Sequence, residues 1–176
     1  PEDAKGLLAR AIDTPNPVLF FEHKALYRSL TADVPTNDYS QDFGRCRLVG
    51  ETRDAVIVTY GMGVHWGLEE AQRRREADGT EIGVLDLRTL APLDWDGVYA
   101  AARQAGRILV LHEDNLTGGI GAELTARIQS ECFEQLDAPV RRVASMDTPI
   151  PFAPTLEAAY LGNAELQEAL DALLSY

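Results

Sequence analysis

Residues 112–123 read His-Glu-Asp-Asn-Leu-Thr-Gly-Gly-Ile-Gly-Ala-Glu, and they say more about the fold than any other segment of the chain. The apolar run 107–111 leads into this segment, and a helical pattern begins at Ile120. This order indicates a strand, a polar glycine turn and a helix start. Glycines allow a sharp turn, and the free N–H groups of a first helical turn suit an anion or an acidic partner group. The pattern therefore predicts either a binding site or tight packing of a helix against a strand.

The same rhythm of strand and helix continues on both sides of this segment. Strands are predicted at 55–60, 82–87, 108–111 and 140–144, and helices at 68–76, 95–104, 120–136 and 165–174. Such alternation builds parallel β-α-β units that bury both faces of a sheet. We therefore expect an α/β domain over residues 45–176, with a mostly parallel sheet and helices on both faces. Two apolar stripes are expected to be plain core: Ile120, Leu124, Ile128, Cys132 and Leu136, and Leu166, Leu170, Leu173 and Leu174.

The first 44 residues do not follow this rhythm. A helix is predicted at 3–12 and a strand at 18–21, whereas residues 29–44 are polar and have no sustained period. A lone helix and a lone strand cannot bury their apolar faces as an independent unit. We therefore expect residues 1–28 to be the tail of a preceding domain and 29–44 to be a linker. On this interpretation the chain is a piece of a longer polypeptide.

Composition and charge exclude several classes of partner. The 176 residues are 45% hydrophobic and 25% charged, as in one globular domain with a real core. The net charge of −12 and the pI near 4.6 argue against binding to nucleic acid or anionic membrane, and favour a basic partner.

The two cysteines, Cys46 and Cys132, do not have the spacing of a disulfide framework or of a zinc site. No apolar run approaches the roughly 20 residues of a membrane span. A reducing cytoplasm is the expected location.

A second glycine turn suggests a nicotinamide cofactor as an alternative. Gly61, Gly63 and Gly67 follow a predicted strand and open a helix, and Asp86 ends the next strand. This order is close to the Rossmann arrangement for dinucleotides. The spacing is Gly-x-Gly-x-x-x-Gly, however, and Trp66 would crowd the phosphate. Tight packing of the helix on the strand explains the same glycines.

No complete catalytic set is visible in the sequence. His112 and Glu113 could act as a general base or as metal ligands, but the zinc-protease motif needs a second histidine four positions later. A hydrogen-bonded structural histidine is the simpler interpretation. No nucleophile elbow, phosphate loop or Cys–His pair is present. An α/β domain without such a set is expected to dock onto, or complete, something larger.

Several blocks of sequence recur together in one known family. They are 3–8 (Asp-Ala-Lys-Gly-Leu-Leu), 16–18 (Asn-Pro-Val), 20–28 (Phe-Phe-Glu-His-Lys-Ala-Leu-Tyr-Arg), 86–94 (Asp-Leu-Arg-Thr-Leu-Ala-Pro-Leu-Asp), 112–123, 138–139 (Ala-Pro) and 147–151 (Asp-Thr-Pro-Ile-Pro). In order and at familiar distances, they resemble the C-terminal half of the beta subunit of the thiamine-diphosphate-dependent 2-oxoacid dehydrogenases. The form of block 20–28 is closer to bacterial and branched-chain members than to the mitochondrial pyruvate enzyme.

The resemblance implies a division of the chain and a shared activity. Residues 1–28 would close the pyrimidine-binding domain, and 45–176 would form a transketolase C-terminal domain. The family decarboxylates a 2-oxoacid oxidatively and transfers the acyl group to lipoyl, using thiamine diphosphate with Mg between its alpha and beta subunits. Its activating glutamate and its catalytic histidine lie earlier in beta. The resemblance therefore places no catalytic and no cofactor-binding residue in this segment, which is expected to be inactive alone.

The resemblance also implies contacts to an ion and to other chains. Main-chain carbonyls at Ala11, Thr14 and Asn16 would help to hold a monovalent cation, usually potassium, although the family commonly has Asp where Thr14 stands. The partners would be the alpha subunit, a second beta subunit in an α2β2 tetramer, and the basic subunit-binding domain of the acyltransferase core. Asp137 and the terminal carboxylate of Tyr176 would face an arginine of that domain.

Two alternatives stay open at the level of sequence. One is a stand-alone nicotinamide-binding oxidoreductase built on the turn at 61–67. The other is the C-terminal part of transketolase or of 1-deoxyxylulose-5-phosphate synthase, which share the domain but fit blocks 20–28 and 147–151 less well. The sequence does not identify which 2-oxoacid would be used.

Overall fold

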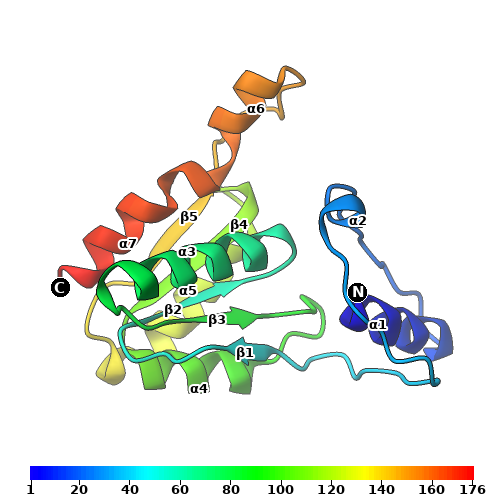
Figure 1. The fold of residues 1–176 in the computed structure, drawn as a ribbon. Coiled ribbons are helices and arrows are strands. Elements are labelled where there is room, and N and C mark those ends of the chain that lie inside the picture. Colours follow the sequence, from blue (N-terminus) through cyan, green and yellow to red (C-terminus); the bar gives the residue numbers. More distant parts are fainter.

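The sheet at the centre of the molecule has five strands. In the computed structural model, which describes residues 1–176, they are β1 (Arg47–Val49), β2 (Ala55–Thr59), β3 (Ile82–Asp86), β4 (Ile108–Asn115) and β5 (Arg141–Ser145) (Figure 1). Their order is β1-β3-β2-β4-β5. The last four strands are mutually parallel, and β1 pairs antiparallel with β3. The predicted α/β fold with a mostly parallel sheet is confirmed.

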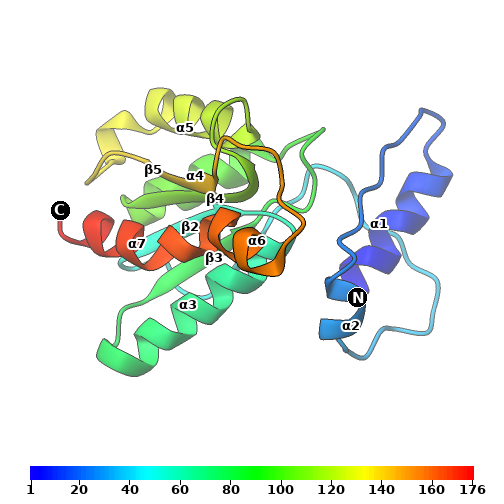
Figure 2. The same ribbon diagram turned by 90° about the horizontal axis from the view of Figure 1, so that it is seen from above.

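Four helices cover the two faces of this sheet (Figure 2). On one face lie α3 (Met62–Asp78) and α7 (Leu166–Leu174), and on the other lie α4 (Trp95–Ala105) and α5 (Ile120–Glu131). Because successive strand side chains point to opposite faces, Val56 and Val58 pack in the core under α4 and α5, whereas Ile57 packs in the core under α3 and α7. The expected helices on both faces are therefore present.

Two further helices stand beside the carboxyl ends of the strands (Figure 1). They are α1 (Glu2–Asp13) and the short α2 (Leu26–Ser29). The Asp3 carboxylate ties α1 to the body, since it lies 2.8 Å from Nη2 of Arg88 and 3.3 Å from Nη2 of Arg47. A second contact connects the N-terminal segment to β4: Nε2 of His23 lies 3.1 Å from Oε1 of Glu113, within hydrogen-bond distance.

Residues 29–44 wrap around α1. The Tyr39 hydroxyl donates a hydrogen bond of 2.8 Å to the Glu2 carbonyl, and the Gln41 amide donates one of 3.0 Å to the Gly6 carbonyl. The Lys5 ammonium donates to the Pro35 carbonyl over 2.6 Å. The predicted absence of regular structure is confirmed, but the segment supports α1 in addition to connecting it.

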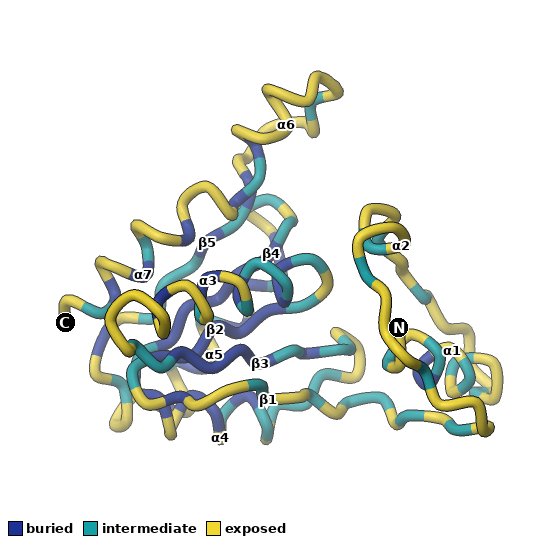
Figure 3. Tube along the Cα trace, viewed as in Figure 1, coloured by how far each residue is buried: buried dark blue, intermediate teal, exposed yellow.

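The predicted strand at 18–21 is wrong. These residues form no strand, and Leu19 and Phe21 are 85% and 88% exposed (Figure 3). A strand needs a neighbour to accept and donate its backbone hydrogen bonds. All five strands of the molecule lie in the central sheet, so the apolar run at 18–21 has nothing to pair with.

The predicted helix 120–136 is too long. It ends at Glu131 and is followed by the 3₁₀ turn η1 (Phe133–Gln135), because the chain must turn back to enter β5. Leu136 therefore leaves the helical stripe, while Cys132 stays buried in the core. The sequence patterns missed the three-residue β1, the four-residue α2, and also α6 (Pro154–Tyr160) with the 3₁₀ turn η2 (Gly162–Glu165). None of the helices combines the length and the apolar character needed to cross a bilayer.

Candidate functional site

The imidazole of His112 packs directly beneath the first turn of α5. The His112 side chain is 0% exposed in the second half of β4, which runs four residues beyond the predicted strand 108–111 into the stretch expected to be a turn. A Cβ on Gly119 would stand 2.6 Å from the ring carbon Cε1, and a Cβ on Gly121 would overlap Nε2. The glycines of segment 112–123 thus allow the helix backbone to rest directly on the imidazole. The burial of this histidine agrees with the structural role inferred from the sequence, but no protein atom lies in good hydrogen-bond geometry to either ring nitrogen, so the expected hydrogen bond is absent.

The burial of His112 predicts a pH dependence of stability. Burial lowers the pKa of His112 from 6.5, because the imidazolium would lose its hydration, although the Asp114 carboxylate opposes this. A histidine whose folded pKa is lowered contributes stability above its unfolded pKa of about 6.5, and the contribution is lost as the pH falls below that value. We expect the free energy of unfolding in urea to fall more steeply from pH 7 to 5 in the native chain than in His112→Gln. Equal slopes would contradict this.

The turn after β4 holds the base of a protruding arm, which we define as residues 146–161 (Figure 1). The Asn115 side-chain amide donates to the Met146 carbonyl over 2.6 Å. The amide and hydroxyl of Thr117 donate to the Asp147 carboxylate over 2.8 and 2.6 Å. These two bonds hold the pKa of Asp147 below its usual range. Two of the sequence blocks, 112–123 and 147–151, therefore meet in space.

The glycine turn at 61–67 serves helix packing. A Cβ on Gly63 would overlap the Thr59 hydroxyl, and a Cβ on Gly67 would stand 3.3 Å from a methyl group of Val84. Asp86 accepts a hydrogen bond of 3.0 Å from the amide of Arg88, and burial raises the pKa of its carboxyl group. The glycines thus bring α3 close to the sheet, which is the simpler of the two interpretations made from the sequence.

The two predicted partner-binding residues lie at the amino-terminal edge of the sheet. Asp137 is exposed, and its carboxylate lies 3.6 Å from the guanidinium of Arg107, just before β4. The ring of Tyr176 lies 6.0 Å from the guanidinium of Arg141, the first residue of β5. Since β4 and β5 are parallel neighbours, both residues are on the same edge. The fold therefore places on one edge two positions that are far apart in sequence.

The three predicted cation ligands lie at and beyond the carboxyl end of α1. Thr14 caps that helix: its hydroxyl donates to the Arg10 carbonyl over 2.8 Å, and its amide donates to the Ala11 carbonyl over 3.4 Å. Asn16 is exposed just beyond. The carbonyls of a helix end carry partial negative charge, which suits a cation. The potassium site stays a prediction.

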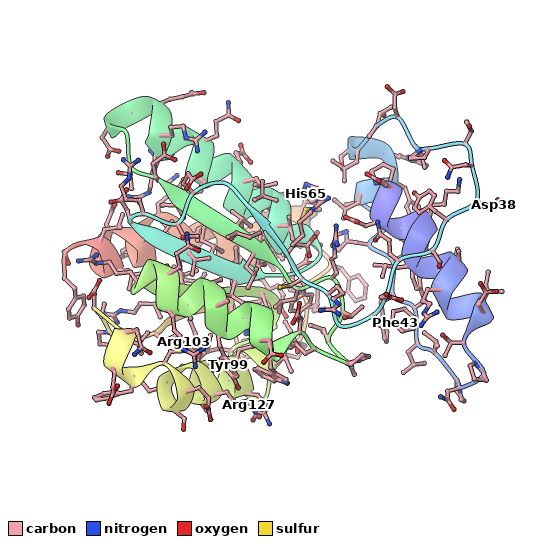
Figure 4. All side chains as sticks on the ribbon, turned by 90° about the horizontal axis from the view of Figure 1, so that it is seen from below. Asp38, Phe43, His65, Tyr99, Arg103 and Arg127 are labelled. Carbon is pink, nitrogen blue, oxygen red and sulfur yellow. The ribbon has the colours of Figure 1, made fainter.

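A row of aromatic and arginine side chains covers the outer surface of α4 and α5 (Figure 4). The rings of Trp95 and Tyr99 stack with their centroids 5.9 Å apart. Arg103 lies over Tyr99 at 5.7 Å, and Arg127 lies over Trp95 at 4.2 Å. The Arg127–Trp95 contact joins α5 to α4, whereas the Arg103–Tyr99 contact lies within α4. Arg103 also donates to the Glu131 carbonyl of α5 over 3.1 Å, so the row is a packing feature.

The fold and these sites define an α/β domain with a mostly parallel sheet. Its motifs are used in helix packing and in holding an arm, and no three His, Cys, Asp or Glu side chains gather into a metal site. The family described as "Transketolase, C-terminal domain" matches residues 44–165, and the chain belongs to this family.

The relatives agree with the resemblance inferred from the sequence blocks. The chain is 42% identical to "2-oxoisovalerate dehydrogenase subunit beta" of Bacillus subtilis over 170 residues, which are 96% of this chain and 52% of that protein. It is also 42% identical to "Pyruvate dehydrogenase E1 component subunit beta" of the same organism, over 93% of this chain and 50% of that protein. The resemblance is therefore confirmed, and the chain spans about half the length of the curated relatives it matches.

A solved structure agrees on the architecture. A chain described as "Split gene transketolase, inactive beta4 tetramer" superposes with a TM-score of 0.64 at 28% identity, over 82% of this chain and 46% of that one. The relatives favour a dehydrogenase beta subunit over the alternatives, a nicotinamide oxidoreductase or a part of transketolase or 1-deoxyxylulose-5-phosphate synthase.

Proposed function

We propose that this chain is the C-terminal half of the beta subunit of a 2-oxoacid dehydrogenase, where it serves subunit assembly and docking to the acyltransferase core. The whole enzyme would decarboxylate a 2-oxoacid oxidatively and pass the acyl group to lipoyl. The observation that carries the proposal is the 42% identity to a branched-chain beta subunit over 170 residues. The two free cysteines are compatible with a cytoplasmic enzyme.

Thiamine diphosphate and Mg would be held outside this segment, by the alpha subunit and the earlier part of beta. This placement rests on the resemblance, in which the residues that hold the cofactor precede this segment. The histidine of segment 112–123 is enclosed beneath a helix and has no path to a substrate. We therefore assign this segment no step of the decarboxylation.

The first 28 residues would belong to the pyrimidine-binding domain, as the resemblance implies. The exposed apolar run at 18–21 supports this proposal, since a strand-like segment without neighbours is what remains of a sheet whose other strands lie elsewhere. Two alpha subunits and a second beta subunit would supply the rest of an α2β2 tetramer.

Docking to the acyltransferase core would use the amino-terminal edge of the sheet. Asp137 and Tyr176 lie on that edge, and an arginine of the partner can bind a carboxylate such as that of Asp137 through two parallel hydrogen bonds. The Arg107 guanidinium stands 3.6 Å from Asp137, too far for a strong pair, so a partner arginine can displace it. The net charge of −12 would speed encounter with a basic domain.

Reversing the charge at Asp137 tests this docking site. We expect Asp137→Arg to weaken binding to the isolated subunit-binding domain about tenfold or more, because it replaces a salt bridge with a repulsion. Isothermal titration calorimetry measures the Kd. Glu69→Arg is the matched control, since Glu69 is an exposed acid on α3. If both variants bind like the native chain, Asp137 does not lie in the interface.

A further inference from the structure

Several large apolar side chains of the arm 146–161 are exposed to solvent. Phe152 is 102% exposed, Ile150 is 66% exposed and Leu156 is 60% exposed. Figure 3 shows the tip of the arm as an exposed extension beyond the sheet. Clustered apolar side chains on a surface mark a contact with another molecule, because leaving them in water is unfavourable.

The arm is fixed at its base. Asp147 accepts two hydrogen bonds from Thr117, and the Met146 amide donates to the Tyr160 carbonyl over 3.2 Å, which closes the arm into a loop. Tyr160 is only 3% exposed, and a Cβ on Gly162 would stand 2.7 Å from the backbone of Ala144. A tip held in this way loses little conformational entropy when it is bound.

The charge around the arm indicates what kind of surface it fits. From Val143 to Tyr176 the chain carries five acidic residues and no Lys, Arg or His; the acids are Asp147, Glu157, Glu165, Glu168 and Asp171. Glu157 is exposed beside the apolar tip. The same region of a second copy would bring the same acids and no base, so two arms do not complement one another in charge. A groove with basic side chains at its rim is complementary.

We infer that the arm docks into an apolar groove, rimmed by Lys or Arg, on a partner polypeptide of a different kind. The inference rests on the proposed function for the identity of that partner, which is then the alpha subunit and not the second beta subunit. The side chains of Ile150, Phe152 and Leu156 would fill the groove, and Glu157 would meet its rim. The fixed base would set the orientation of the partner relative to the sheet.

The test compares variants of the arm with matched variants of η1. Phe152→Asp and Glu157→Lys alter the arm, while Phe133→Asp and Glu134→Lys make the same changes at exposed positions at the far end of α5. Binding of each chain to the alpha subunit of the same enzyme is measured by sedimentation velocity. We expect Phe152→Asp to raise the Kd at least tenfold, about 1.4 kcal/mol, and the η1 variants to leave it unchanged.

The outcomes separate the two proposals. If the native chain binds the alpha subunit and the arm variants bind equally well, the arm is not the contact, while the proposed function stands. If the native chain does not bind the alpha subunit, the proposed partnership fails together with the arm. If Phe152→Asp instead abolishes self-association of the chain alone, the occupant is a second copy and the inference is overturned. If Glu157→Lys leaves the Kd unchanged, the groove does not have the basic rim that we infer.

Discussion

Gly121→Ala should destabilise the domain by about 2 kcal/mol, although alanine is the better helix former. The added Cβ would overlap Nε2 of His112, a ring that is completely buried and cannot move aside. Overpacking of this kind forces the backbone or the ring to shift. Urea unfolding followed by circular dichroism gives the free energy of unfolding.

A double-mutant cycle with His112 identifies the cause. His112→Ala should itself cost about 2 kcal/mol or more, because it leaves a cavity under α5. In that background Gly121→Ala should cost little, since the methyl group then enters the space of the missing ring. The interaction free energy between the two positions should therefore be large. Additive losses would show that Gly121 is needed for another reason.

Arg74→Ala should have the second large effect, a loss of about 3 kcal/mol in the free energy of unfolding. Arg74 is buried between α3 and α7 and donates to Oε1 of Glu70 over 2.7 Å. It also donates to the Gln167 carbonyl over 3.0 Å and lies 2.7 Å from the Asp171 carboxylate. Removing it would separate the two helices and leave the buried Glu70 with Arg73 alone.

The pH dependence of this loss distinguishes an ion pair from simple packing. Burial would raise the pKa of Glu70, but hydrogen bonds from Arg73 and Arg74 outweigh burial and lower it. A carboxyl group with a lowered pKa contributes stability above its unfolded pKa and loses that contribution as the pH falls through its folded pKa. The difference between Arg74→Ala and the native chain should therefore shrink in acid. Arg75→Ala, at an exposed ion pair on the same helix, should cost less than about 1 kcal/mol.

The framework of the domain could be predicted from local pattern, because each element carries its own apolar period. The runs at β2, β3, β4 and β5 are apolar enough to indicate buried strands, and the order of strand and helix implied the parallel sheet. Helix starts were less visible: α3 begins at Met62, six residues before its apolar pattern becomes regular at Leu68. Small residues pack the first turns of that helix, and they give no amphipathic signal.

The features that escaped prediction depend on contacts between distant segments. The strand-like run at 18–21 carries the right residues but lacks a neighbouring strand. The arm at 146–161 is held by Asn115 and Thr117, which are about thirty residues away in sequence. The positions of Asp137 and Tyr176 came from a family resemblance, and only the fold places them on one edge. Sequence pattern predicts elements, whereas these sites arise from how the elements meet.

The order of the strands also bears on solubility during synthesis and storage. An open sheet has two borders at which a foreign strand can add and start a fibril. Here one border is the short antiparallel β1, and the other is β5, which begins with Arg141 and Arg142. Charged side chains and short length both discourage such growth. Both borders of the sheet thus resist the addition of foreign strands. The molecule can expose an apolar arm for binding without also exposing a sheet border that favours aggregation.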